Sequence, residues 1–176
     1  MFGPLGTSFD VGCEALYVQR CLSELHRLDD RIAAYDGHIA VMARSDPRSS
    51  QLMRLGGIGP TTASCMVAMV GNGHEFRCGR QFAAWLGLVP GQYNSGGKAR
   101  LGRITKAGDG YLRSLLILGA RAVLVAAQGK TDPVSRWAIV LAERRGYWKA
   151  VVAIAAKNAR MAWAMLRRGD AFVMPT

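Results

Sequence analysis

A heptad repeat of apolar residues over 12–43 constrains the fold of this chain more than any other sequence feature. Apolar residues recur there at alternating steps of three and four. This heptad seam consists of Val18, Cys21, Leu25, Leu28, Ile32, Tyr35, Ile39 and Met42. A seam sustained over about three heptads predicts a long helix that pairs with another helix. We therefore expect a coiled-coil helix over 12–46 that joins copies of the chain into a homo-oligomer. The alternative is a helix packed on the core of its own domain.

Residues 47–170 are predicted to form one helical domain. Asp46-Pro47 is typical of a helix start, with Asp as N-cap and Pro at the first helical position, and Asp132-Pro133 repeats this pattern. Other helical patterns cover 79–88, 111–127 and about 148–168. The last has a seam for close packing, made of Val152, Ala155, Ala159, Ala162 and Leu166. Because no segment alternates as a strand does, the predicted fold is mainly α.

The segment around Gly56–Pro60 resembles the turn of a helix-hairpin-helix. A short helix ends at Leu55, the glycine-rich turn follows, and Thr61 begins a helix that runs through Val70. Glycines allow a tight turn and a close approach to a partner, and free N–H groups at a helix start can hold a phosphate oxygen. Gly57, Gly59 and Thr61 are therefore candidate nucleic-acid contacts. The alternative is a plain corner between two helices.

The charge of the chain is distributed unevenly. Residues 1–76 have a net charge of −2, whereas residues 77–176 hold seventeen Lys and Arg but four Asp and Glu, for a net charge of +13. This asymmetry predicts a bound polyanion, most commonly nucleic acid, and the alternative is a solvated basic surface. No apolar run suits a membrane span or a signal peptide, and the four cysteines form no zinc pattern. We expect a cytoplasmic protein with reduced thiols and no metal site of its own.

The stretch Gly87–Gly110 combines many glycines with cations and is expected to be an irregular loop. Such a loop suits the approach of a phosphate backbone. The candidate phosphate contacts are Lys98, Arg100, Arg103 and Lys106, followed by Arg113 in the next helix. Ser95 stands beside two glycines in this loop, so its hydroxyl is a candidate nucleophile. No His or carboxylate lies within about ten residues to act as its base, and the alternative is an ordinary glycine-serine turn.

Four sequence blocks together resemble one protein family. They are 55–63 (LGGIGPTTA), 82–90 (FAAWLGLVP), 93–104 (YNSGGKARLGRI) and 110–113 (GYLR). In order and spacing they resemble the C-terminal domain of the bridge-RNA-guided insertion-sequence transposases, which are related to the pilin-gene invertases. The resemblance spans about residues 50–168, and the heptad helix resembles the family's coiled-coil linker. It identifies 47–170 as a helical transposase C-terminal domain.

The resemblance implies a chemistry for Ser95. In the family, a serine of this domain attacks a DNA phosphodiester and forms a phosphoserine link, and Ser95 occupies the matching position. The family often reads Tyr-Ser-Ser-Gly-Gly-Lys, and here Asn94 replaces the first serine. A complete member is about twice this length, because an N-terminal RuvC-like domain supplies four carboxylates that bind Mg²⁺. We find no such domain in these 176 residues.

We therefore expect a truncated or split transposase that binds DNA and a structured guide RNA. Alone, it is not expected to complete strand transfer, and the Mg²⁺ belongs to the missing RuvC-like domain. A second interpretation is a catalytically inactive DNA- or RNA-binding regulatory module that pairs with full-length copies. A third, a ribosome-associated or other structural RNA-binding protein, explains the charge but not the Ser-Gly-Gly turn.

Overall fold

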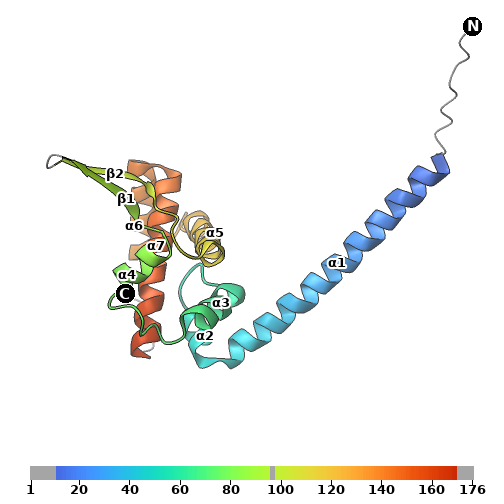
Figure 1. Ribbon diagram of the computed structural model, residues 1–176, viewed down its shortest axis with the longest axis horizontal. Helices are drawn as coiled ribbons and strands as arrows, with labels where there is room; N and C mark the ends of the chain where they lie inside the picture. The colour runs from blue at the N-terminus through green and yellow to red at the C-terminus, as the bar shows by residue number, and fades with distance from the viewer. Residues whose placement is uncertain (1–10, 96–97, 170–176) are drawn as a thin grey trace, which may run out of the picture. The chain divides into compact units, whose positions relative to one another are not determined.

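The computed structural model describes residues 11–95 and 98–169 (Figure 1). Within these residues the chain forms seven helices and one two-stranded sheet, so the prediction of a mainly α fold is confirmed. In chain order the elements are α1 (Val11–Ser45), α2 (Pro47–Leu52), α3 (Pro60–Val70), α4 (Gly79–Trp85), β1 (Pro90–Ser95), β2 (Lys98–Ile104), α5 (Gly110–Ala126), α6 (Pro133–Arg145) and α7 (Tyr147–Arg168).

The chain divides into two compact units, Met1–His38 and Ile39–Thr176. The described part of the first unit is helix α1, which carries the heptad seam. Seam side chains are open to solvent in the single chain: Leu25 is 56% exposed, Ile32 57% and Tyr35 60%. Helix α1 covers nearly all of the predicted range 12–46, and most of its apolar seam is exposed among the described residues. The coiled coil itself remains a prediction.

Two aspartates begin helices of the second unit as predicted. The side chain of Asp46 accepts a hydrogen bond of 2.9 Å from the backbone N–H of Arg48, and Pro47 is the first residue of α2. Partial burial works to raise the pKa of Asp46, but the hydrogen bonds from Arg48 outweigh it and hold this pKa below its ordinary value. Asp132 caps α6 in the same way, because its side chain accepts a hydrogen bond of 2.9 Å from the backbone N–H of Ser135.

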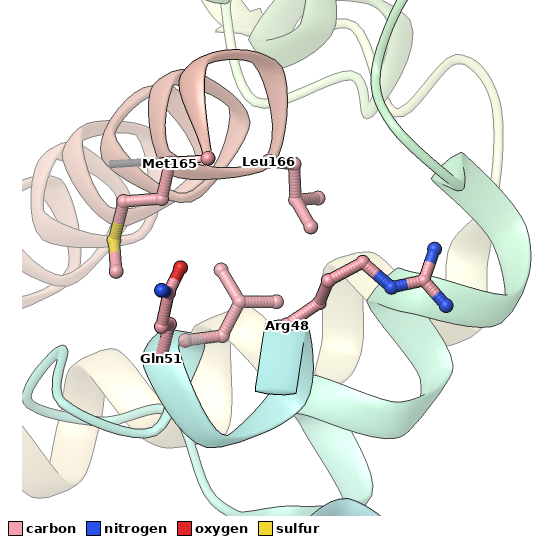
Figure 2. A pocket seen from close by; sticks show the side chains of 6 residues that line it. Arg48, Gln51, Met165 and Leu166 are labelled. Carbon is pink, nitrogen blue, oxygen red and sulfur yellow. The ribbon is translucent and has the colours of Figure 1, made fainter. Parts of the chain in front are cut away.

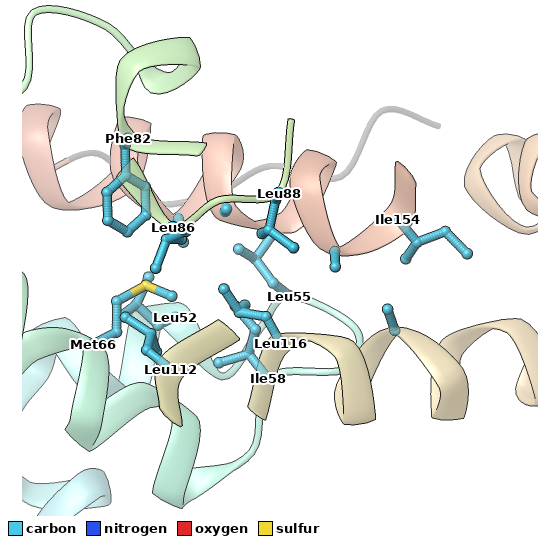
Figure 3. Close-up of a cluster of buried hydrophobic side chains, with 14 of the residues drawn as sticks. Leu52, Leu55, Ile58, Met66, Phe82, Leu86, Leu88, Leu112, Leu116 and Ile154 are labelled. Carbon is cyan, nitrogen blue, oxygen red and sulfur yellow. The ribbon is translucent and has the colours of Figure 1, made fainter. Parts of the chain in front are cut away.

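Helix α7 is central to the core of the second unit, because α2, α4, α5 and α6 all contact it. The largest buried side chains come from several elements and meet in one cluster (Figure 3), which includes Leu52, Met66, Phe82, Leu116 and Ile154. The predicted small-residue seam of α7 explains this close packing. Its three alanines, Ala155, Ala159 and Ala162, are fully buried, Leu166 is 8% exposed, and Val152 is half-buried.

The expectation of an irregular loop over 87–110 is wrong for residues 90–104. Strands β1 and β2 pair antiparallel there, with Tyr93 opposite Arg100 and Ser95 opposite Lys98, and the register is irregular between Pro90 and Gln92. The hairpin extends away from the helices, and within the described residues it contacts none of them (Figure 1). Because the hairpin backbone stays apart from the helical core, its sequence lacks the alternation of apolar and polar residues by which a half-buried strand is predicted.

Candidate nucleic-acid interface

The turn between α2 and α3 is anchored from two sides within the protein. Gly57 has φ of 85°, and a Cβ placed on it would lie 2.6 Å from the carbonyl oxygen of Gly119 in α5. The Gly57 backbone therefore packs directly on the α5 backbone. From α7, the buried side chain of Asn158 donates a 2.8 Å hydrogen bond from Nδ2 to the carbonyl oxygen of Gly56. These contacts fix the shape of the turn.

Gly59 and Thr61 lie differently from Gly57. Gly59 is exposed, open space surrounds the position of a Cβ there, and no side chain caps the start of α3. Within the described residues, the N–H groups of Thr61 and Thr62 have no acceptor, and Pro60 has no N–H. Because such a helix start attracts anions, the N–H of Thr61, beside the exposed Gly59, is a candidate phosphate contact, whereas Thr62 is buried. The nucleic-acid contacts of Gly57, Gly59 and Thr61 remain predictions.

The β1–β2 hairpin brings Ser95 and the predicted cations into one element. Ser95 ends β1 and Lys98 begins β2 directly opposite, and Arg100 and Arg103 continue along β2. Lys106 follows the strand and donates its backbone N–H to the carbonyl oxygen of Gly87 at 3.2 Å. The side chains of Arg103 and Lys106 are exposed. Gly96, Gly97 and the side chains of 93–100, including those of Ser95, Lys98 and Arg100, lie outside the described residues.

Arg113 occupies the base of the hairpin rather than an open basic surface. Its guanidinium Nη1 donates to the carbonyl oxygens of Leu86 and Ala107, both at 3.0 Å, and of Asp109 at 3.4 Å. These contacts join the end of α4, the chain after β2 and the start of α5. The sequence prediction of a phosphate contact missed this structural role. The cation was visible in the sequence, but nothing there indicates its carbonyl partners.

We expect Arg113→Ala to lower the free energy of unfolding by about 1.5–3 kcal/mol, because hydrogen bonds from a charged donor to half-buried carbonyls are lost. Urea denaturation of the mutant and wild-type chains measures this difference. Ser114→Ala is the control, since its hydroxyl is exposed and bonds only to the carbonyl of Gly110 within the same helix. An Arg113→Ala chain as stable as wild type, but with weaker DNA binding, would show that this side chain serves nucleic acid rather than the fold.

Helix α5 connects the two candidate elements. Its N-cap is Asp109, whose carboxylate accepts a hydrogen bond from the backbone N–H of Leu112. Near the start of the helix, Arg113 bonds to the carbonyls that flank the hairpin. Six residues later, about 9 Å along the helix axis, Gly119 contacts the α2–α3 turn. One rigid helix therefore positions both the basic hairpin and the open start of α3.

Within the part of the chain that the structure describes, few other features suggest a metal site, a nucleophile or a ligand pocket. No three His, Cys, Asp or Glu side chains there gather as metal ligands. Burial, reinforced by the Asp109 carboxylate, raises the pKa of the Cys65 thiol, which makes it a poor nucleophile at neutral pH. A small pocket between α2 and the end of α7 is lined by Arg48, Gln51, Leu52, Met165, Leu166 and Gly169 (Figure 2). It contains none of the predicted site residues.

Comparison with known proteins gives a family match for part of the chain. Residues 49–134 match the transposase IS116/IS110/IS902 family. The matched segment runs from α2 to the start of α6, so it includes the α2–α3 turn, the hairpin and α5. None of the described helices has the length and apolar character that a membrane-crossing helix needs.

Relatives named as transposases support the same family. A "Probable family 20 transposase" of Pseudomonas aeruginosa is 51% identical over 145 residues, which are 82% of this chain and 43% of the relative. The "Transposase for insertion sequence element IS1111A" of Coxiella burnetii is 41% identical over 156 residues, 88% of this chain and 43% of the relative. The corresponding protein of element IS1328 from Yersinia enterocolitica is 32% identical, over 89% of this chain and 48% of its own length. The chain thus spans less than half the length of each of these relatives.

Proposed function

We propose that this chain is the DNA-binding C-terminal part of an insertion-sequence transposase and that Ser95 is its nucleophile. The observation that carries the proposal is the position of Ser95. It ends β1 directly opposite Lys98, in a hairpin that projects from the helices and carries further cations. A backbone that projects in this way is accessible to DNA. The match over residues 49–134 to a transposase family includes this hairpin.

The proposed reaction transfers a phosphoryl group of DNA to serine. The Ser95 oxygen bonds to the phosphorus of a phosphodiester, the bond from phosphorus to one deoxyribose oxygen breaks, and the hydroxyl proton passes to a base. A serine hydroxyl reacts in this way only when it is activated. No carboxylate or His lies within ten residues of Ser95. We therefore assign its activation to the Mg²⁺-binding carboxylates of a RuvC-like domain.

The proposal also covers the binding partners and the cellular location of the complete protein. Its substrate is DNA, a structured guide RNA selects the site, and it acts in the cytoplasm, where both are available. On its own, this chain binds nucleic acid without cleaving it. The second candidate, an inactive regulatory module, is favoured by the exposed heptad seam, which offers a means to pair with full-length copies. Covalent attachment of DNA to Ser95, in the chain joined to a RuvC-like domain, separates the two.

The basic hairpin is expected to dominate the salt dependence of DNA binding. Replacing Lys98, Arg100, Arg103 and Lys106 by Gln should reduce the slope of log affinity against log salt by about 3–4, since each lost phosphate contact contributes about 0.9. Fluorescence anisotropy with duplex DNA at several salt concentrations measures the slope.

The matched control removes the same charge from α1. Arg20, Arg27, Arg31 and Arg44 are all exposed, and changing them to Gln should leave the slope nearly unchanged. Equal slopes for the hairpin mutant and the wild-type chain would reduce the hairpin to a solvated basic surface.

The heptad seam is expected to join two copies of the chain. Ile32→Asp places a charge in the middle of the seam and should raise the dissociation constant of the oligomer by about 100-fold, because the carboxylate would lose its water in the interface. Analytical ultracentrifugation over a concentration series measures this change.

Ala34→Asp is its control, because position 34 lies two residues past the seam residue Ile32, outside the seam, and is exposed. A wild-type chain that sediments as a monomer at every concentration would refute self-association through the seam.

A further inference from the structure

The corner between α6 and α7 exposes aromatic and cationic side chains together. Gly146 has φ of 87° and ψ of 156°, which lets the chain pass from the last turn of α6 directly into α7. The two helix ends therefore lie next to each other. Exposed side chains here, with one from α5, form what we call the corner surface: Arg121, Arg144, Arg145, Tyr147, Trp148 and Lys149.

Trp148 is the most exposed of the four tryptophans. Its exposed fraction is 63%, against 37% for Trp85 and 36% for Trp137, and Trp163 is partly buried and donates to the carbonyl oxygen of Gly73. Trp85 also lies against Phe76 and Phe82, and the ring of Trp137 is covered by the Lys157 ammonium at 4.6 Å. Trp148 also has ring contacts, but it remains the most exposed of the four tryptophans.

The neighbours of Trp148 define its surroundings. The Tyr147 ring meets it edge-on at a centroid distance of 5.2 Å and is 40% exposed. From α5, the guanidinium carbon of Arg121 lies 5.7 Å from the indole centroid. A largely exposed aromatic ring with a cation over it suits a nucleotide, whose base stacks on the ring while its phosphate meets the cation.

The charges of the corner surface favour an anionic partner. Neither ion pair within the described residues, Arg27–Glu24 or Arg48–Asp46, involves its cations. Glu143 is the acid next to them in the sequence, so the four cations exceed the acids locally. Lys149 lies in the first turn of α7, where the helix dipole disfavours a cation, and no acid accompanies it. Helix stability does not explain a cation at this position, whereas binding to an anion does.

We propose that the corner surface binds an unpaired stretch of nucleic acid. A base stacks on Trp148, and Arg121, Arg144, Arg145 and Lys149 contact the flanking phosphates. Stacking requires an unpaired base, because the faces of bases within a duplex are already covered by their neighbours. The surface is formed by α5, α6 and α7 and does not use the hairpin, so this inference does not depend on Ser95 as a nucleophile.

Binding of labelled oligonucleotides to the whole chain tests the proposal. The probes are oligo(dT) and oligo(rU) of about 12 nucleotides, an abasic strand of the same length, a duplex and, as an acidic polypeptide, labelled poly-glutamate. Trp148→Ala is expected to weaken binding of both single strands by about 5- to 100-fold, and Trp148→Phe to restore most of it. Duplex and abasic strands should bind both mutants as they bind the wild type. Tyr17→Ala, which removes an exposed aromatic from α1, is the matched control.

Three outcomes would overturn the proposal. One is a Trp148→Ala chain that binds oligo(dT) and oligo(rU) as tightly as wild type. Another is an equal loss for abasic and base-containing strands, which would leave no part for stacking. The third is a Trp148→Ala chain that binds poly-glutamate more weakly than wild type but binds the nucleic-acid probes equally well. This result would assign the surface to a protein partner. A preference between DNA and RNA supports the proposal and identifies the source of the strand. Covalent attachment of DNA to Ser95 is measured in a separate experiment, so failure here is distinct from failure of the proposed function.

Discussion

Gly119→Ala is expected to destabilise the protein by about 2–4 kcal/mol, although alanine is the better helix former. Gly119 lies inside α5, where intrinsic helix propensity alone predicts a gain of about 1 kcal/mol from this change. A Cβ at this position would collide with the carbonyl oxygen of Gly57. Since the oxygen belongs to the backbone and the position of a Cβ is fixed by the backbone, no side-chain rotation relieves the overlap, and the α2–α3 turn must move away from α5.

Helix propensity and the contact with Gly57 predict opposite signs for the change in stability, so one measurement separates them. Gly37→Ala is the matched control, because Gly37 also lies inside a helix and has nothing within 4 Å of a Cβ. Urea denaturation should show a lower free energy of unfolding for Gly119→Ala and an equal or higher one for Gly37→Ala. A stabilised Gly119→Ala chain would mean that the turn does not pack on α5 through its backbone.

Ser95→Ala is expected to abolish covalent protein–DNA adducts in the chain joined to a RuvC-like domain, while DNA affinity changes by less than about twofold. The mutation removes the oxygen that would bond to phosphorus and leaves the cations of the hairpin in place. Denaturing gel electrophoresis with end-labelled DNA detects the adduct, and anisotropy measures binding.

The control for Ser95→Ala is the neighbouring change Asn94→Ala. Asn94 pairs with Ala99 in the same ladder but carries no nucleophile, so its mutant should retain adduct formation. The chain without a RuvC-like domain should form no adduct with or without Mg²⁺. Adducts that persist in Ser95→Ala would place the nucleophile at another residue.

The sequence predicted those features that depend on local rules. Asp46 and Asp132 cap helices because an aspartate before a proline satisfies free N–H groups wherever the helix later packs. The alanines of α7 are buried because their spacing places them on one side of the helix. The hairpin was not predicted because its backbone stays apart from the core, although the Gly96-Gly97 pair is itself a turn signal for a hairpin.

Contacts between distant residues could not be predicted from one sequence. Asn158 stands among the apolar positions of α7, which marks it as a buried polar residue, but its partner, Gly56, is 102 residues away. In the sequence, Arg113 looks like any other cation of the basic half, because its carbonyl partners, just after α4 and just before α5, are seen only in the structure. Gly57 and Gly119 are needed because they touch each other, and no spacing rule relates them.

Locating the covalent bond tests the central claim most directly. The chain joined to a RuvC-like domain is reacted with DNA in the presence of Mg²⁺, the complex is digested with nuclease and protease, and the peptides are identified by mass spectrometry. We predict a nucleotide remnant on the peptide that contains Ser95, attached to the serine oxygen. A remnant on a different residue, or an equal yield of modified peptide from this chain alone, would contradict the assignment of Ser95 as the nucleophile of a composite site.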